Sequence, residues 1–186
     1  MSELQTTAVS RDRSAVHRIE AQLGNETFPF AYSGETLEQF VEDLQSHLKV
    51  PVVIDRTALE EYGIGTDTPI KFKVEGIATR SALRLCLTEL DLTYSIANEV
   101  ILITTPEEAE AMLDTRVYDV AETRLTTEAL LELITTTIRD SSWDAVGGPG
   151  KIAVATPETL VISQTQDVHE RVVDLLAQLT RVARSR

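Results

Sequence analysis

Several residue types are scarce in this sequence, and each scarcity excludes something. The 186 residues include a single cysteine, Cys86, so no disulfide can form within the chain. No apolar run approaches the roughly 20 residues of a membrane-spanning helix, so we expect no direct membrane insertion. Basic residues number 17 against 30 acidic ones, and the formal net charge is −13. Such a chain repels phosphate groups, which disfavours general nucleic-acid binding and attachment to anionic lipids.

The remaining composition is that of an ordinary globular protein, 42% hydrophobic and 25% charged. At roughly 100–150 residues per domain, this length suits one large domain or two small ones. The start, Met1 to Thr7, lacks the apolar run of a signal peptide. We therefore expect a cytoplasmic protein if Met1 is the native start; the alternative is an excerpt of a longer protein with a new initiator methionine.

Hydrophobic periodicity predicts a first module over residues 15–105, after a polar lead-in, residues 1–14, that we expect to be disordered. Its clearest element is a helix over 36–48, whose buried stripe is predicted to be Leu37, Phe40, Val41, Leu44 and Leu48. The other expected elements are a helix ending at Gly24, a strand over 27–32, a strand over 51–54, a helical turn over 58–62, a strand over 70–74, a helix over 79–90 capped by Thr79, and a hairpin of strands 92–96 and 100–104.

The pattern restarts after an acidic, helix-prone linker over residues 106–113. A second module is predicted over 114–182, followed by a tail over 183–186. Its expected elements are a strand over 116–120, a helix over 127–138, a hairpin of strands 152–155 and 160–163, and a helix from about residue 166. This order, strand-helix-strand-strand-helix, is KH-like. We predict an α+β protein of two small modules, each a short mixed sheet packed with two helices.

Residues 27–32 are the best candidate for a partner-binding strand. Phe28, Phe30 and Tyr32 alternate onto one face, and Pro29 cannot donate a ladder hydrogen bond, which favours the edge of a sheet. An exposed edge can recruit an extended partner segment by adding it to the sheet. An equally supported alternative is that this strand pairs with another strand of its own module.

The single tryptophan, Trp143, is a candidate interface anchor, because tryptophan is enriched among the residues that dominate protein interfaces. The favoured alternative is a plug in a small core. Nearby, Gly147-Gly148-Pro149-Gly150 matches the G-x-x-G loop with which KH modules hold a nucleic-acid backbone. A predicted strand follows this loop, however, and Lys151 is the only nearby base, so we expect a tight turn.

Residues that could carry chemistry are present but not grouped. His17, His47 and His169 have no second histidine or cysteine at metal-ligand spacing, and we expect them at the surface. Cys86 falls on the apolar stripe of its helix and is expected to be a buried structural thiol. Solvent-exposed helix positions are expected for the acidic cluster of Glu107, Glu108 and Glu110. We therefore predict no catalytic, cofactor-binding or metal-binding residues.

Two segments carry a resemblance to a known family. Residues 76–104, with the run Gly76-Ile77-Ala78-Thr79-Arg80-Ser81-Ala82-Leu83-Arg84 and the strand Val100-Ile101-Leu102-Ile103-Thr104, resemble the short N-terminal domain shared by secretins and TonB-dependent receptors. The strand Leu160-Val161-Ile162-Ser163-Gln164-Thr165, with the apolar helix after it, resembles the ending of the KH-like ring domains that follow in secretins. Residues 143–150 are similar to secretin-like proteins of planctomycete type.

The resemblance implies a non-catalytic interaction and assembly module of a type II secretion-like envelope complex, located in the periplasm. It implies a protein partner from the secretion or envelope machinery, assembly into homo-oligomers, and no cofactor. The chain has no membrane-spanning secretin region, so it could not form the channel alone. Two alternatives are a receptor-type signalling domain that binds a regulator and, less favoured, a KH-type RNA-binding protein.

Overall fold

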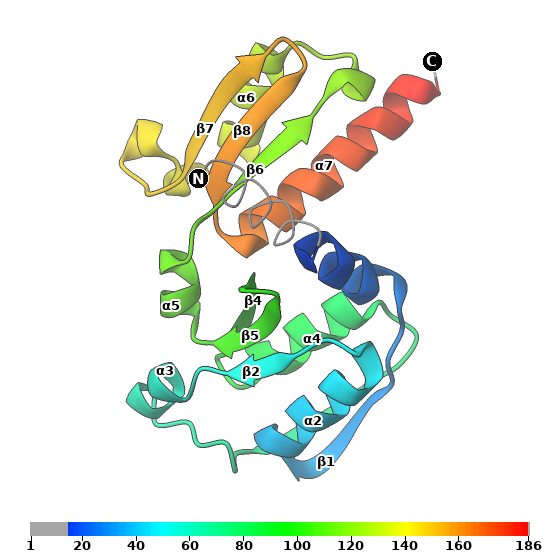
Figure 1. The fold of residues 1–186 in the computed structure, drawn as a ribbon, viewed down its shortest axis with the longest axis vertical. Helices are drawn as coiled ribbons and strands as arrows, with labels where there is room; N and C mark the ends of the chain where they lie inside the picture. The colour runs from blue at the N-terminus through cyan, green and yellow to red at the C-terminus, as the bar shows by residue number, and fades with distance from the viewer. Residues whose placement is uncertain (1–14, 186) are drawn as a thin grey trace, which may run out of the picture. The chain divides into compact units, whose positions relative to one another are not determined.

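The structure of the protein is a computed structural model that describes residues 15–185. The lead-in that we expect to be disordered, residues 1–14, lies outside the described residues. The chain divides into two compact units between Ala109 and Glu110 (Figure 1). We call the part before this division unit 1 and the part after it unit 2. The division falls within the segment 106–113; the exact module limits and independent folding of the units stay predictions.

Unit 1 contains two small sheets and several helices (Figure 1). Its elements are a helix over residues 15–25, β1 (Phe30–Thr36), α2 (Leu37–Leu48), β2 (Val52–Ile54), α3 (Arg56–Glu61), β3 (Pro69–Val74), α4 (Thr79–Thr88), β4 (Thr93–Ala97), β5 (Val100–Thr104) and α5 (Pro106–Ala111), which crosses the division. The α+β class is confirmed. The single sheet expected here is wrong, because β1 and β3 pair with each other, while β2, β5 and β4 form a separate sheet with β2 parallel to β5.

Helix α2 shows how the local sequence fixes an element of unit 1. The Thr36 hydroxyl accepts a hydrogen bond from the Gln39 N–H (3.2 Å), and the Gln39 side chain accepts one from the Thr36 N–H (3.0 Å). This reciprocal capping box satisfies two backbone donors at the helix start. All five apolar residues of the predicted stripe are buried. Because α2 contacts β1, β2 and β3, it connects the two sheets through one core.

Two boundaries in unit 1 differ from those expected. Strand β1 begins at Phe30, three residues later than predicted, because Pro29 has no N–H to donate to a ladder. At the start of α4 the cap position is Ala78, and Thr79 is the first helical residue. The Thr79 N–H and hydroxyl both donate to the carbonyl of Glu26, each at 2.9 Å. A backbone carbonyl from another segment therefore satisfies a donor that we expected a side-chain cap to satisfy.

Unit 2 has one three-stranded antiparallel sheet, in the order β6-β8-β7 (Figure 1). Its elements are β6 (Asp114–Asp119), the 3-10 turn η1 (Ala121–Thr123), α6 (Thr127–Thr137), the 3-10 turns η2 (Asp140–Ser142) and η3 (Asp144–Val146), β7 (Lys151–Thr156), β8 (Thr159–Gln164) and α7 (Gln166–Arg184). The main elements follow the predicted order strand-helix-strand-strand-helix. Helix α7 extends to Arg184, into the segment expected to be a tail.

Both long helices of unit 2 pack on the same face of this sheet. Leu160 and Ile162 of β8 are fully buried and share one core with Leu130 and Ile134 of α6 and with Val172 of α7. Side chains alternate between the two faces of a strand. The neighbours of Leu160 and Ile162 along β8 therefore point to the opposite face, which no helix of unit 2 covers among the described residues.

Candidate functional site

The predicted partner-binding residues of unit 1 lie in and around its core. Phe30 and Tyr32 are buried, and Phe28 is partly buried against them. The ring centroids of Phe28 and Phe30 are 5.2 Å apart, and those of Tyr32 and Phe40 are also 5.2 Å apart. Strand β1 pairs with β3 on one side, and no described strand lies along its other edge. A partner added there would meet the β1 backbone first. The binding role of these residues stays a prediction.

Trp143 is buried in the core of unit 2, where the core-plug alternative places it. Its indole N–H donates to the carbonyl of Ile138 at 2.8 Å. This bond satisfies the single polar atom of the side chain, so the whole ring can be buried without an unpaired donor. A role as an interface anchor is not tested by this position and stays a prediction.

The glycine-rich segment forms a closed loop that is fixed by backbone hydrogen bonds. Asp144 donates to Gly150 (2.8 Å), Gly150 donates to Ser142 (2.9 Å), and the Gly148 N–H donates to Trp143 (2.9 Å). A Cβ on Gly148 would lie 2.2 Å from the Ser142 backbone, so a larger residue cannot fit. The strand expected after this loop is present as β7. We call residues 144–149 the glycine loop.

The open face of the unit 2 sheet is a row of small apolar side chains. Val117, Val161 and Ala153 are directly opposite one another on β6, β8 and β7. The rows beside them carry hydroxyl groups, including those of Thr115 and Ser163. Val117 is 51% exposed, although it belongs to a regular strand. We call the whole surface the open face and define it as Thr115, Val117, Asp119, Lys151, Ala153, Thr159, Val161 and Ser163.

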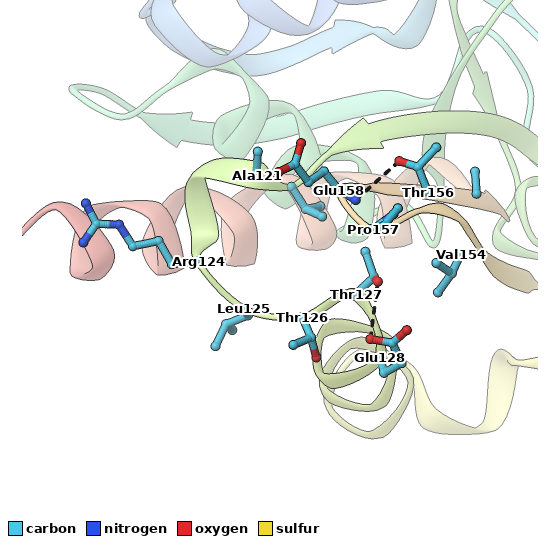
Figure 2. A pocket seen from close by; sticks show the side chains of 12 residues that line it. Ala121, Arg124, Leu125, Thr126, Thr127, Glu128, Val154, Thr156, Pro157 and Glu158 are labelled. Atoms are coloured by element: carbon cyan, nitrogen blue, oxygen red, sulfur yellow. Dashed lines mark hydrogen bonds between the residues drawn. The ribbon is translucent and has the colours of Figure 1, made fainter.

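A groove of about 590 Å³ lies at the end of β7. One wall is the connection between β6 and α6, and the other is the turn between β7 and β8 (Figure 2). Leu125 and Val154 bring exposed apolar surface to it, at 42% and 40% exposure. The side chain of Arg124 extends from one end of the groove, apart from the carboxylates of Glu128 and Glu158 (Figure 2). We call this feature the β7 groove.

His169 is buried, so the prediction that it lies at the surface is wrong. Its Nε2 lies 2.9 Å from the carbonyl oxygen of Asp114, and its Nδ1 lies 2.8 Å from the hydroxyl of Tyr118. The carbonyl can only accept, so Nε2 carries a proton and donates it there, while Nδ1 faces the Tyr118 hydroxyl, which can donate or accept. The side chain was misjudged because the first turns of α7 are buried on more than one stripe.

Asp114 and Arg116 extend the same network, with the Asp114 carboxylate half-exposed and the Arg116 side chain largely buried. The Arg116 Nε donates to the Asp114 carboxylate at 2.8 Å, and its guanidinium also reaches Gln166 of α7 at 2.6 Å. Burial raises the pKa of Asp114, but the hydrogen bond and charge of Arg116, together with His169 and the Thr115 N–H, outweigh it and leave the pKa lowered. The network therefore fastens the start of β6 to the start of α7.

The described residues do not gather reactive side chains around a pocket. Cys86 is buried, and burial with the nearby Glu89 charge raises the pKa of its thiol to about 12. It is therefore a thiol at neutral pH and fills space in the core of unit 1. Within residues 15–185, no group of three or more acidic, histidine or cysteine side chains is arranged to hold a metal ion. No helix of that range has the length and hydropathy that a bilayer crossing requires.

Sequence reasoning missed the residues that make the surface of unit 2 distinctive. These are Val117, Leu125, Val146 and Val154, large apolar residues that are each at least 40% exposed. A signal existed for one of them: Val117 alternates with Arg116 and Tyr118 in a strand whose other side faces the core. The groove could not have been found in this way, because its walls are about 30 residues apart in the chain.

Among known proteins, the chain matches solved structures only. No protein-family model and no curated protein sequence match the chain. It aligns over 83% of its length with 94% of a chain in the InvG N0N1–SpaPQR–PrgHK structure from the Salmonella SPI-1 injectisome, at 13% identity and a TM-score of 0.34. It aligns over 84% with 99% of a chain in the enterotoxigenic Escherichia coli GspC–GspD complex of the type II secretion system, at 12% identity and a TM-score of 0.30. It aligns over 82% of its length with 38% of a chain in the structure of the V. cholerae type IV competence pilus secretin PilQ, at 12% identity and a TM-score of 0.32. The predicted resemblance to secretin N-terminal domains is thus found again among solved structures.

Proposed function

We propose that this chain is a non-catalytic module for protein–protein interaction and assembly in a secretin-like, type II secretion-like complex of the cell envelope. The observation that carries the proposal is the open face of unit 2. Apolar side chains gain free energy when a partner removes them from water. A regular sheet with helices on one face and an uncovered apolar row on the other offers such a surface ready-made.

The distribution of charge on the open face supports a protein partner. Its centre is apolar or hydroxyl-bearing, and its charged residues, Asp119 and Lys151, stand on the two outer strands, β6 and β7. Interface centres are depleted of charged residues and surrounded by a polar rim. The net charge of −13 opposes phosphate backbones and favours encounter with a basic protein surface.

The envelope part of the proposal rests on the sequence resemblance described above, carried by residues 76–104 and 160–165. It supports a location in the periplasm, beside partners of the secretion machinery. The free edge of β1, with Phe28, Phe30 and Tyr32 behind it, is a second surface that such a partner could use through backbone pairing.

The proposal is tested by cross-linking the tagged full chain in its own cells and purifying it. The wild type is expected to give a discrete heavier species that contains an envelope protein. Val117→Lys should remove that species, because it places a charge in the apolar row. Val173→Lys is the matched control, since Val173 is an exposed valine on α7. Equal yields of the heavier species from the wild type and both variants would overturn the proposal. The absence of that species from all three would overturn it as well.

A further inference from the structure

The β7 groove opens on the face of the unit 2 sheet that the helices cover. Val154 stands opposite Leu160, which is fully buried, and two residues after Ile152, which packs against the core of unit 2. Cross-strand partners and alternate residues of one strand share a face, so Val154 belongs to the covered face. It is nevertheless 40% exposed, and it lines the groove. The groove is therefore an opening in the covering of the core.

Both walls of the groove contribute apolar surface. Leu125, just before α6, is 42% exposed, and Pro157 stands in the turn between β7 and β8. The volume of about 590 Å³ lies within the roughly 300–1,000 Å³ of typical ligand pockets. An apolar side chain that enters the groove removes Leu125 and Val154 from water, which favours binding. The groove is thus suited to the apolar part of a ligand.

The charges that line the groove are mainly negative. Glu128 comes from the first turn of α6 and Glu158 from the β7–β8 turn. Arg124, the one base among the described residues of the lining, extends away from both carboxylates (Figure 2). Among residues 15–185, neither glutamate takes part in an ion pair, and the Glu128 carboxylate accepts a 3.5 Å hydrogen bond from the Thr127 hydroxyl. Unpaired carboxylates beside apolar surface favour a ligand that is both cationic and apolar.

We infer that the β7 groove binds a segment of a partner protein in which an apolar residue stands next to a lysine or arginine. The apolar side chain packs on Leu125 and Val154, and the cation pairs with the carboxylates of Glu128 and Glu158. The partial positive charge at the start of α6 weakens the contribution of Glu128, so Glu158 is expected to contribute more. This inference rests on the proposed function in taking a protein as the ligand, and it adds a contact separate from the open face.

The combination of apolar and negative surface favours a peptide over other ligands. The two carboxylates repel an anionic lipid surface. A free polyamine carries the charge but has no apolar side chain to cover Leu125 and Val154. A peptide supplies both groups, and the net charge of −13 favours its encounter with the chain when it is basic.

NMR titration of the isotope-labelled full chain with short peptides tests the site. The probe is acetyl-Ser-Leu-Arg-Leu-Ser-amide, and its reference is the same peptide with glutamine in place of arginine. We expect the arginine peptide to shift the backbone resonances of Leu125, Val154 and Glu158. It should bind about threefold or more tightly than the reference peptide. Spermidine, a cation without apolar side chains, should bind more weakly than the arginine peptide.

Charge variants of the groove sharpen the test. Glu158→Lys should weaken binding of the arginine peptide by about tenfold, and Glu128→Lys by less. Glu61→Lys makes the same change of net charge on α3 of unit 1 and should bind as the wild type does. The spectra also show whether each variant is folded, and Glu128→Lys carries the comparison if Glu158→Lys is not.

Several results would overturn the inference. They are equal affinity for the two peptides, spermidine binding as tight as that of the arginine peptide, shifts that fall outside the groove, or groove variants that bind as Glu61→Lys does. Val117→Lys should leave the peptide affinity unchanged, whereas it should remove the cross-linked species. The groove contact and the proposed function can therefore fail separately.

Discussion

The two units divide their apolar side chains differently between core and surface. Unit 1 packs rings of Phe28, Phe30, Tyr32, Phe40 and Phe72 against one another. Unit 2 is the shorter, yet it carries seven of the ten exposed large hydrophobic residues of the described chain. Apolar side chains left in water mark docking surfaces where they gather, as in the row of Val117, Ala153 and Val161, and we therefore propose that unit 2 makes more of the partner contacts.

The two units also differ in the kinds of polar groups that they bury. Those of unit 1 are hydroxyls, namely Thr79, Ser95, Thr104 and Thr105. Those of unit 2 include amides and titratable groups, among them Gln164, Gln166, His169 and Glu170. A buried polar network requires each partner to be in place, so it specifies one geometry where a small apolar core would not. We infer that unit 2 holds its surfaces in position partly through these bonds.

The largest effect is expected from Phe30→Ala in unit 1. Removing a buried phenylalanine costs about 3–5 kcal/mol in free energy of unfolding. The single cysteine and the single tryptophan report on different units: Cys86 on unit 1 and Trp143 on unit 2. The variant should therefore expose Cys86 to a thiol reagent at lower denaturant concentration, while the fluorescence transition of Trp143 is unchanged. A parallel shift of both transitions would contradict independent units.

An intermediate effect is expected from Gly150→Ala in unit 2. The added Cβ would lie 2.0 Å from the Gln164 amide nitrogen, which donates to the Ser142 carbonyl and hydroxyl. We expect a loss of about 1–3 kcal/mol, seen in the Trp143 fluorescence transition. Gly24→Ala is the control, because its Cβ would make ordinary contact at 3.6 Å. If Gly150→Ala unfolds as the wild type does, the close packing of Gly150 against Gln164 does not stabilise unit 2.

The smallest effect is expected from Asp114→Asn. The folded-state pKa of Asp114 is lowered, so the ionised carboxylate stabilises the fold above its unfolded pKa near 4. This contribution is lost as the pH falls through the folded-state pKa. The side chain is 53% exposed, so we expect less than about 1 kcal/mol at pH 7. Stability curves of variant and wild type should converge as the pH falls below the folded-state pKa; a constant gap would contradict the charge argument.

The sequence alone predicts those elements that depend on residues close together in the chain. Helix α2 was predicted from its apolar stripe, and the β7–β8 hairpin from the apolar pattern of residues 152–155 and 160–163. Strand β1 begins later than the predicted strand, because Pro29 has no N–H to donate to the ladder. The parallel pairing of β2 with β5 could not be read from the sequence, because it depends on a partner about 50 residues away.

The candidate site was harder to predict than the fold. Trp143 was noticed because tryptophan is rare here, and its favoured alternative, a core position, matches its burial. The open face and the β7 groove were missed, since each depends on which side of a sheet the helices cover. That choice is made by the packing of α6 and α7, which no single stretch of sequence encodes.

The central claim is that unit 2 works through a surface rather than a reactive side chain. A photo-cross-linking residue placed at Ala153 of the full chain, in its native cells, tests this most directly, with the same residue at Val173 as the reference position. We predict a discrete protein adduct from position 153 and none from position 173. No adduct from position 153, or the same adducts from both positions, would contradict the account.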